Sequence, residues 1–144
     1  EFDCVSVSNK HTVIRDDIVA KALSAALNSN LFWWYYSINF DLFNFKDYMI
    51  FGFQFTYTDK TTLSNIIKLS DQMEISLREN AVYYSINSAT NGLNETVTYQ
   101  KFKSKDIMDT IDKELKKIYN FTDEELDFII NYDIKYRMGD ELNE

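Results

Sequence analysis

Aromatic residues crowd one stretch of the chain, and this crowding limits how the protein can fold. The 144 residues include 11 Phe, 10 Tyr and 2 Trp, and thirteen of these rings lie between residues 31 and 57. No single amphipathic helix or strand buries so many rings on one face. We expect part of this segment to form the core, and the rest to pack on another molecule or to meet a flat ligand.

Alternating apolar and polar residues predict several short strands. Residues 82–86 and 96–99 alternate on either side of the turn signal Asn91-Gly92, which predicts a hairpin. The same alternation predicts a strand over residues 51–57 and a further hairpin within residues 1–15.

Apolar residues at helical spacing predict helices between and after these strands. Such spacing covers residues 16–28 and residues 63–79, and Ser104 is placed to cap a helix that runs to about residue 118. The capping box Thr122-Asp123-Glu124-Glu125 opens another helix. We therefore expect one α+β domain over residues 1–144, with short hairpins and a small sheet packed against several helices, and a helical C-terminal section.

The composition excludes most catalytic machinery. The only glycines are Gly52, Gly92 and Gly139 and there is no proline, so no glycine-rich loop that binds phosphate is present. Cys4 and His11 are the only residues of their kinds, which excludes a disulfide framework and a zinc site of several Cys and His ligands. Cys4 is expected to be a small buried side chain, and His11 has no obvious partner for a hydrolase triad.

The chain is acidic and has no sequence signal for a membrane. Its formal net charge is −8, and no run approaches the roughly 18 consecutive apolar residues of a membrane span. Residues 1–30 lack the pattern of a signal peptide. We expect a soluble, cytoplasmic protein.

Two acidic segments are candidates for a metal site. Residues 112–116, Asp-Lys-Glu-Leu-Lys, contain the Glu-x-Lys spacing of metal-dependent nucleases, but residues two apart on a helix face different directions. This pattern favours a solvated, ion-paired helix surface. Residues 123–125 are carboxylates placed at the positive end of a helix. A nuclease that holds a divalent ion on carboxylates is therefore the third-ranked function.

Lysines and asparagines around the second predicted hairpin favour contact with nucleic acid. Three lysines lie within five residues where the chain leaves this hairpin, and such a group neutralises phosphates. Asparagine amides reach base edges. The residues that we predict to contact DNA are Lys46, Lys101, Lys103, Lys105, Asn44, Asn87 and Asn91. The net charge opposes this interpretation, because independent DNA-binding domains are usually basic.

Two segments resemble a known family. The block FTDEELDFIINYDIKYRMG at residues 121–139 resembles the C-terminus of large adenine-specific DNA methyltransferases of restriction-modification and phage-defence systems, including the bifunctional type IIG enzymes. Upstream, LNSNLFWWY at residues 27–35 and NFKDY at residues 44–48 are similar to a pattern of the TaqI-like specificity domain. The two matches span most of residues 17–139.

The resemblance implies target recognition rather than methyl transfer. In that family a separate N-terminal domain binds S-adenosylmethionine with a glycine-containing loop and holds the flipped adenine with an Asn/Asp-Pro-Pro-Tyr motif. This sequence contains neither, so we expect a piece of a larger enzyme that is inactive alone and binds no cofactor itself. Residues 1–103 would form the target-recognition part and residues 104–139 the helical section. The expected partners are double-stranded DNA and the catalytic domain of the same polypeptide.

The alternative is a module that docks on the body of such an enzyme and never touches DNA. The positions of the lysines in the folded chain separate the two functions. DNA contact is favoured if Lys46 lies on the same side as Lys101, Lys103 and Lys105. A broad surface of rings without lysines favours docking.

Overall fold

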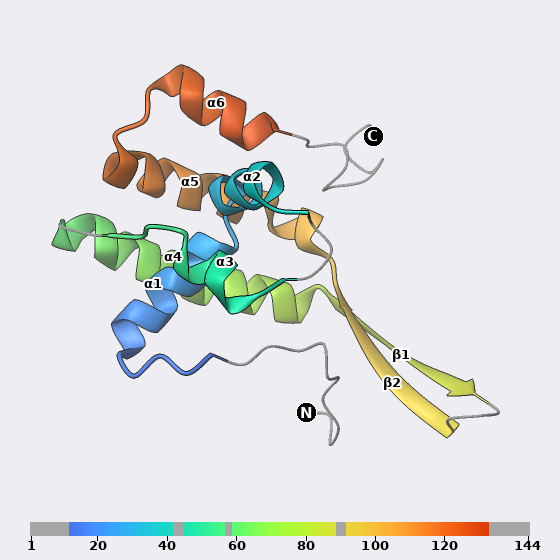
Figure 1. The fold of residues 1–144 in the computed structure, drawn as a ribbon. Helices are drawn as coiled ribbons and strands as arrows, with labels where there is room; N and C mark the ends of the chain where they lie inside the picture. The colour runs from blue at the N-terminus through green and yellow to red at the C-terminus, as the bar shows by residue number, and fades with distance from the viewer. Residues whose placement is uncertain (1–11, 42–44, 57–58, 89–91, 133–144) are drawn as a thin grey trace.

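The computed structural model describes residues 12–41, 45–56, 59–88 and 92–132. Over these residues the fold is α+β, as the sequence predicts. It is a body of helices from which one antiparallel hairpin projects, whereas the sequence analysis expects the sheet to pack against the helices (Figure 1). In chain order the elements are α1 (Asp17–Leu27), α2 (Asn30–Asn39), α3 (Asp47–Phe51), α4 (Lys60–Glu79), β1 (Ala81–Ser88), β2 (Gly92–Tyr99), the 3-10 helix η1 (Lys101–Ser104), α5 (Lys105–Tyr119) and α6 (Asp123–Asn131).

Helices α1 and α4 pack against each other, and an aspartate caps the N-terminus of each helix. The Asp16 carboxylate accepts hydrogen bonds from the first backbone N–H groups of α1, and Asp59 accepts one from the N–H of Thr62 at 2.7 Å. The buried face of α1 consists of alanines, which lets α4 and its buried Ile66 approach closely. The predicted helices over residues 16–28 and 63–79 are confirmed.

Helices α5 and α6 follow the predicted pattern, with one correction at the start of α5. The capping box at α6 is confirmed: Thr122 Oγ1 accepts from the N–H of Glu125 at 3.2 Å, and the Glu125 carboxylate accepts from the N–H of Thr122 at 2.8 Å. The predicted cap at Ser104 is wrong. Helix η1 runs directly into α5, and the buried Ser104 hydroxyl instead forms a 2.7 Å hydrogen bond with the hydroxyl of Ser76 in α4.

The prediction of a solvated surface for residues 112–116 is wrong at Asp112. This residue is 1% exposed and lies at the N-terminus of α2. Its Oδ1 accepts a hydrogen bond from the N–H of Leu31 at 3.0 Å, and its Oδ2 accepts from the N–H and the side-chain amide of Asn30 at 3.1 and 2.6 Å. The carboxylate thus satisfies backbone donors at the positive end of a helix that is distant in sequence.

The hydrogen bonds continue from Asp112 along α5. The Asn30 amide also donates to Asp109 Oδ1 at 3.0 Å, and Asp109 Oδ2 accepts from the ammonium of Lys105 at 2.5 Å. The rest of the 112–116 segment meets the prediction better, since Glu114 pairs with Lys117 and Lys116 pairs with Asp123. The network of Asp112, Asn30, Asp109 and Lys105 is buried at Asp112 and Asn30 and partly buried at the other two residues, and it joins α2 to α5.

Most rings of the aromatic segment pack into the core. Phe32 on α2 meets Phe53 edge-on with centroids 5.3 Å apart, and it stacks nearly parallel to Tyr36 at 6.3 Å. These three rings are buried, and the neighbouring Trp and Tyr side chains of α2 are half-buried against them. Around α3 the rings of Phe45, Tyr48 and Phe51 stay exposed by 38%, 58% and 63%. The segment therefore both builds the core and leaves an exposed aromatic surface, as predicted.

The predicted strand over residues 51–57 is wrong. Phe51 ends α3, and no described residue from 52 to 56 pairs with a strand. Burial does alternate, because Phe53 and Phe55 pack on the helices while the residues between them are exposed. A Cβ at Gly52 would lie 2.9 Å from the backbone carbonyl oxygen of Tyr48 and 2.8 Å from the hydroxyl oxygen of Tyr35, so this close approach favours glycine. Residues 57–58 lie outside the described part of the chain.

The predicted hairpin within residues 1–15 falls mostly outside the described residues, as do Cys4 and His11; residues 12–15 form no strand. Among the described residues, no helix combines the length and the apolar character needed to cross a membrane.

The Asp112 network predicts a large effect of a conservative substitution. Asp112→Asn puts an amide N–H₂ group against hydrogen-bond donors, so a buried donor loses its partner, and we expect a loss of about 2–4 kcal/mol in the free energy of unfolding. The control is Asp71→Asn, which removes a half-exposed ion pair with Lys21 and is expected to cost below about 1 kcal/mol. Urea denaturation of both variants measures the difference; equal losses would contradict the assigned role.

The same carboxyl predicts a pH dependence. Burial raises the pKa of Asp112 from 3.8 to about 6, although hydrogen bonds from Leu31 and Asn30 oppose the shift. Because the folded state then holds the proton more tightly than the unfolded state, this group stabilises the fold below pH 3.8, and the contribution is lost as the pH rises through about 6. The stability of the wild type relative to Asp112→Asn should increase from about pH 7 to about pH 5. A decrease in urea denaturation over this range would contradict it.

Candidate nucleic-acid interface

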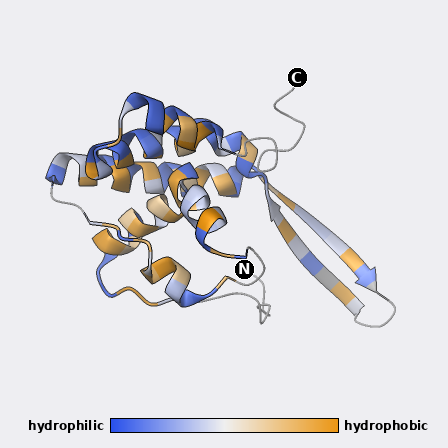
Figure 2. Ribbon diagram, turned by 45° about the horizontal axis from the view of Figure 1, so that its top comes forward, coloured by the Kyte–Doolittle hydropathy of each residue, from blue (hydrophilic) through white to orange (hydrophobic). Residues whose placement is uncertain are grey.

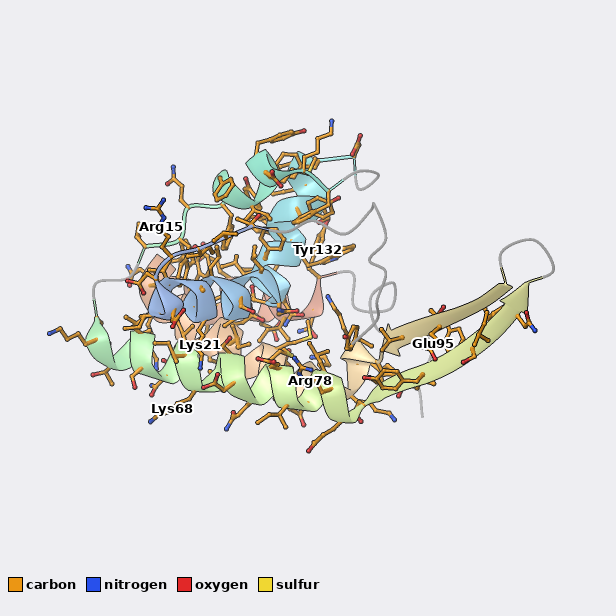
Figure 3. The ribbon with its side chains drawn as sticks, turned by 90° about the horizontal axis from the view of Figure 1, so that it is seen from below. Arg15, Lys21, Lys68, Arg78, Glu95 and Tyr132 are labelled. Carbon is orange, nitrogen blue, oxygen red and sulfur yellow. The ribbon has the colours of Figure 1, made fainter. Side chains whose placement is uncertain are left out.

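The predicted second hairpin exists and stands away from the helical body. Strands β1 and β2 pair antiparallel from Ala81 opposite Tyr99 to Ser88 opposite Gly92, and they project beyond the helices (Figures 1 and 3). Gly92 has a φ of 71°, in the left-handed region that favours glycine. Neither strand packs extensively on a helix, so within the described part of the chain both faces of the hairpin are open.

The pairing register sorts the hairpin residues onto two faces. We call them the Asn87 face and the Tyr84 face. The Asn87 face holds Tyr83, Ser85, Asn87, Leu93, Glu95, Val97 and Tyr99, and the Tyr84 face holds Val82, Tyr84, Ile86, Thr96 and Thr98, with Asn94 at the register position opposite Ile86. Hydrophobic side chains are exposed on both faces, and the ribbon coloured by hydropathy in Figure 2 marks hydrophobic residues on both strands.

The end of α4 and helix η1 meet where the hairpin joins the body. We call this region, comprising Arg78, Tyr99, Lys101 and Lys103, the hairpin root. The hydrogen bond between the two serine hydroxyls of α4 and η1 holds the two helices together here. Arg78 lies in the last turn of α4 (Figure 3) and forms an exposed ion pair with Glu74 at 2.8 Å. Arg78 and Tyr99 line a shallow groove of about 210 Å³ between α1 and α4.

Two of the predicted lysines are free to meet a ligand at the hairpin root. Lys101 and Lys103 are exposed, and neither forms an ion pair with a described residue. The pKa of Lys101 is lowered because its ammonium is partly desolvated, although the residue as a whole is exposed. Asn87 is also exposed, on the hairpin face that Tyr99 shares.

Lys105 has a different environment from its two neighbours. Its side chain is only 17% exposed and its ammonium is paired with Asp109. Because Asp109 in turn accepts from Asn30, Lys105 belongs to the network that joins α2 to α5. We therefore do not include Lys105 in the interface.

The structure does not bring Lys46 to the hairpin root. Lys46 precedes α3, and its ammonium lies 6.0 Å from the centroid of the Tyr48 ring. In Figure 3, α3 and η1 lie on opposite sides of the helical body. The predicted cluster is thus divided between two surfaces. Asn44 and Asn91 lie outside the described residues.

Sequence reasoning missed Arg78 and the role of Tyr99 at the hairpin root. The helix over residues 63–79 and the hairpin that follows it were both predicted correctly. The sequence did not show that the end of α4 packs beside η1. One signal was available, because Arg78 stands four residues before Val82, where the predicted strand begins. A basic residue so close to the hairpin entrance is close in space to the residues at its exit.

Comparison of the chain with protein-family models, with curated proteins and with solved structures found no match. Within the described ranges, no three His, Cys, Asp or Glu side chains converge in the manner of metal ligands. The chemistry of the interface is therefore argued from its own residues.

The open faces of the hairpin predict low local stability. A two-stranded hairpin without a packed face is marginal in water, so its amides should exchange with solvent through local opening rather than global unfolding. We expect protection factors in β1 and β2 at least about 10-fold below those of Ile66 and Ile111, which are fully buried. Native-state hydrogen exchange followed by NMR measures this, and equal protection would mean that the hairpin unfolds with the body.

Proposed function

We propose that the chain is the target-recognition, C-terminal domain of an N6-adenine DNA methyltransferase of a restriction-modification or phage-defence system. In this proposal it acts in the cytoplasm and positions duplex DNA for a separate catalytic domain of the same polypeptide. The observation that supports DNA contact best is the pair of exposed lysines without ion pairs, Lys101 and Lys103, at the root of a projecting hairpin. The resemblance of residues 121–139, which include α6, supports the assignment to this class of enzyme.

The charge distribution is compatible with local DNA contact despite the net charge of −8. From Ala81 to Tyr99 the sequence has a single charged residue, Glu95. Charges further than about 8 Å away are largely screened at physiological ionic strength. A phosphate beside the hairpin root would therefore be affected mainly by Lys101, Lys103 and the Arg78–Glu74 pair, and less by the more distant carboxylates of the helical body.

In this proposal the chain itself does not transfer the methyl group. S-adenosylmethionine would bind in the catalytic domain, since the sequence lacks both motifs that the family uses for cofactor and adenine. The role of the chain is to hold the duplex in register while that domain flips the base.

A docking module that never contacts DNA is the second candidate, and specific observations favour it. The Tyr84 face exposes Val82, Tyr84 and Ile86 by 42%, 44% and 54%, and Lys46 precedes α3, which lies across the helical body from η1. Exposed apolar surface of this kind is typical of contact with another protein or domain.

Removal of charge at the hairpin root tests the proposal. Lys101→Gln and Lys103→Gln should each lower the affinity for duplex DNA by about 3–10-fold at low salt and reduce the salt slope by about one unit per lost phosphate contact. Fluorescence anisotropy over a range of salt concentrations measures both quantities.

The matched control is Lys113→Gln, because Lys113 is exposed on α5 and forms no ion pair with a described residue. This variant should bind like the wild type. If the three variants behave alike, the root lysines make no phosphate contact. If the wild type does not bind duplex DNA even at low salt, the docking function is favoured.

A further inference from the structure

We propose that the β1–β2 hairpin is the element that reads the DNA sequence, by entering the major groove with its Asn87 face against the base edges. This inference rests on the proposed function and deepens it, because it assigns recognition to one element and to named side chains. The hairpin root would then lie against the phosphates at the edge of the groove.

The dimensions of the hairpin fit the groove. Each strand has eight residues, which gives a length of about 27 Å, and paired strands lie about 4.8 Å apart. The major groove of B-DNA is about 12 Å wide and admits a two-stranded ribbon. Because the strands project from the body (Figure 1), the helices do not cover the faces that would meet the bases.

The Asn87 face has the hydrogen-bonding groups that distinguish bases. Ser85 lies directly opposite Glu95 in the register, and Asn87 lies two residues further along β1. An Asn amide binds adenine N6 and N7 together, a carboxylate accepts from cytosine N4, and a hydroxyl serves either base. Leu93, opposite Asn87 and 66% exposed, offers apolar contact to a thymine methyl group.

The charge pattern also favours base reading along the hairpin. Glu95 is its only charged residue, so the strands themselves have no cation to bind phosphates, and Lys101 and Lys103 follow directly where the hairpin ends. Contacts to phosphate position a protein, whereas contacts to base edges specify the sequence. In this arrangement the hairpin root contacts phosphates and the hairpin contacts base edges.

The described side chains of the Tyr84 face offer fewer groups for hydrogen bonds to base edges. Its described side chains are Val82, Tyr84 and Ile86 with two threonines, and the Tyr84 hydroxyl is already hydrogen bonded to Thr98 Oγ1 at 3.0 Å. The Asn87 face in addition ends at Tyr99, which lines the groove with Arg78. This continuity places the reading residues and the basic root on one surface.

The test is selection of duplexes from a random-sequence pool by the full chain, followed by sequencing of the bound fraction. The wild type should enrich a pattern. Asn87→Ala and Glu95→Gln should each weaken the preference at one or two positions by at least about 5-fold and leave the salt slope unchanged. Both side chains are exposed, so circular dichroism should show intact folding. The matched controls, Asn131→Ala and Glu124→Gln on α6, should keep the wild-type pattern.

Two outcomes would overturn the inference, and they are distinguishable. If the wild type enriches a pattern that both hairpin variants retain, the hairpin does not read the sequence, but the proposed function stands. If the wild type retains no duplex at low salt, both the inference and the proposed function fail, and a protein partner for the hairpin is favoured instead.

Discussion

The carboxylate of Asp112 holds together parts of the chain that are about eighty residues apart. It accepts three hydrogen bonds at the start of α2, so the position of that helix is set by α5. Because α2 contributes Phe32 and Tyr36 to the aromatic core, the packing of the rings depends on one buried charge. Breaking one side of such a contact leaves buried donors unsatisfied, which is far more costly than losing a surface ion pair.

Local signals in the sequence predicted much of the fold. Helices α1 and α4, the β1–β2 hairpin and the Thr122 capping box depend on neighbouring residues, and each was predicted at nearly its observed place. The contacts that the sequence did not reveal are long-range. Nothing near Asp112 indicates its partner Asn30, and alternation at residues 51–57 does not distinguish a paired strand from an extended segment that packs on helices.

At the candidate interface, too, local features could be predicted from the sequence and long-range contacts could not. Its location at the exit of the hairpin was predicted, because Lys101 and Lys103 follow β2 directly. Lys105 looked equivalent in sequence, but it points into a pair with Asp109. Lys46 was predicted to contact DNA together with the lysines after β2, but it precedes α3, which lies on the other side of the body from η1. Side-chain direction and the packing of distant helices decided both cases, and neither follows from spacing alone.

The junction between α4 and β1 has a mechanical consequence. Only Asn80 separates the two elements, and its amide donates to the carbonyl of Ser76 at 2.8 Å, so the junction has little slack. A helix of twenty residues is about 30 Å long, and α4 packs against α1 and α5. A tilt of a few degrees, produced by repacking α1 or α5, would swing the tip of the ribbon by several ångströms. The direction in which the hairpin projects can thus be changed by substitutions at residues that do not contact a ligand.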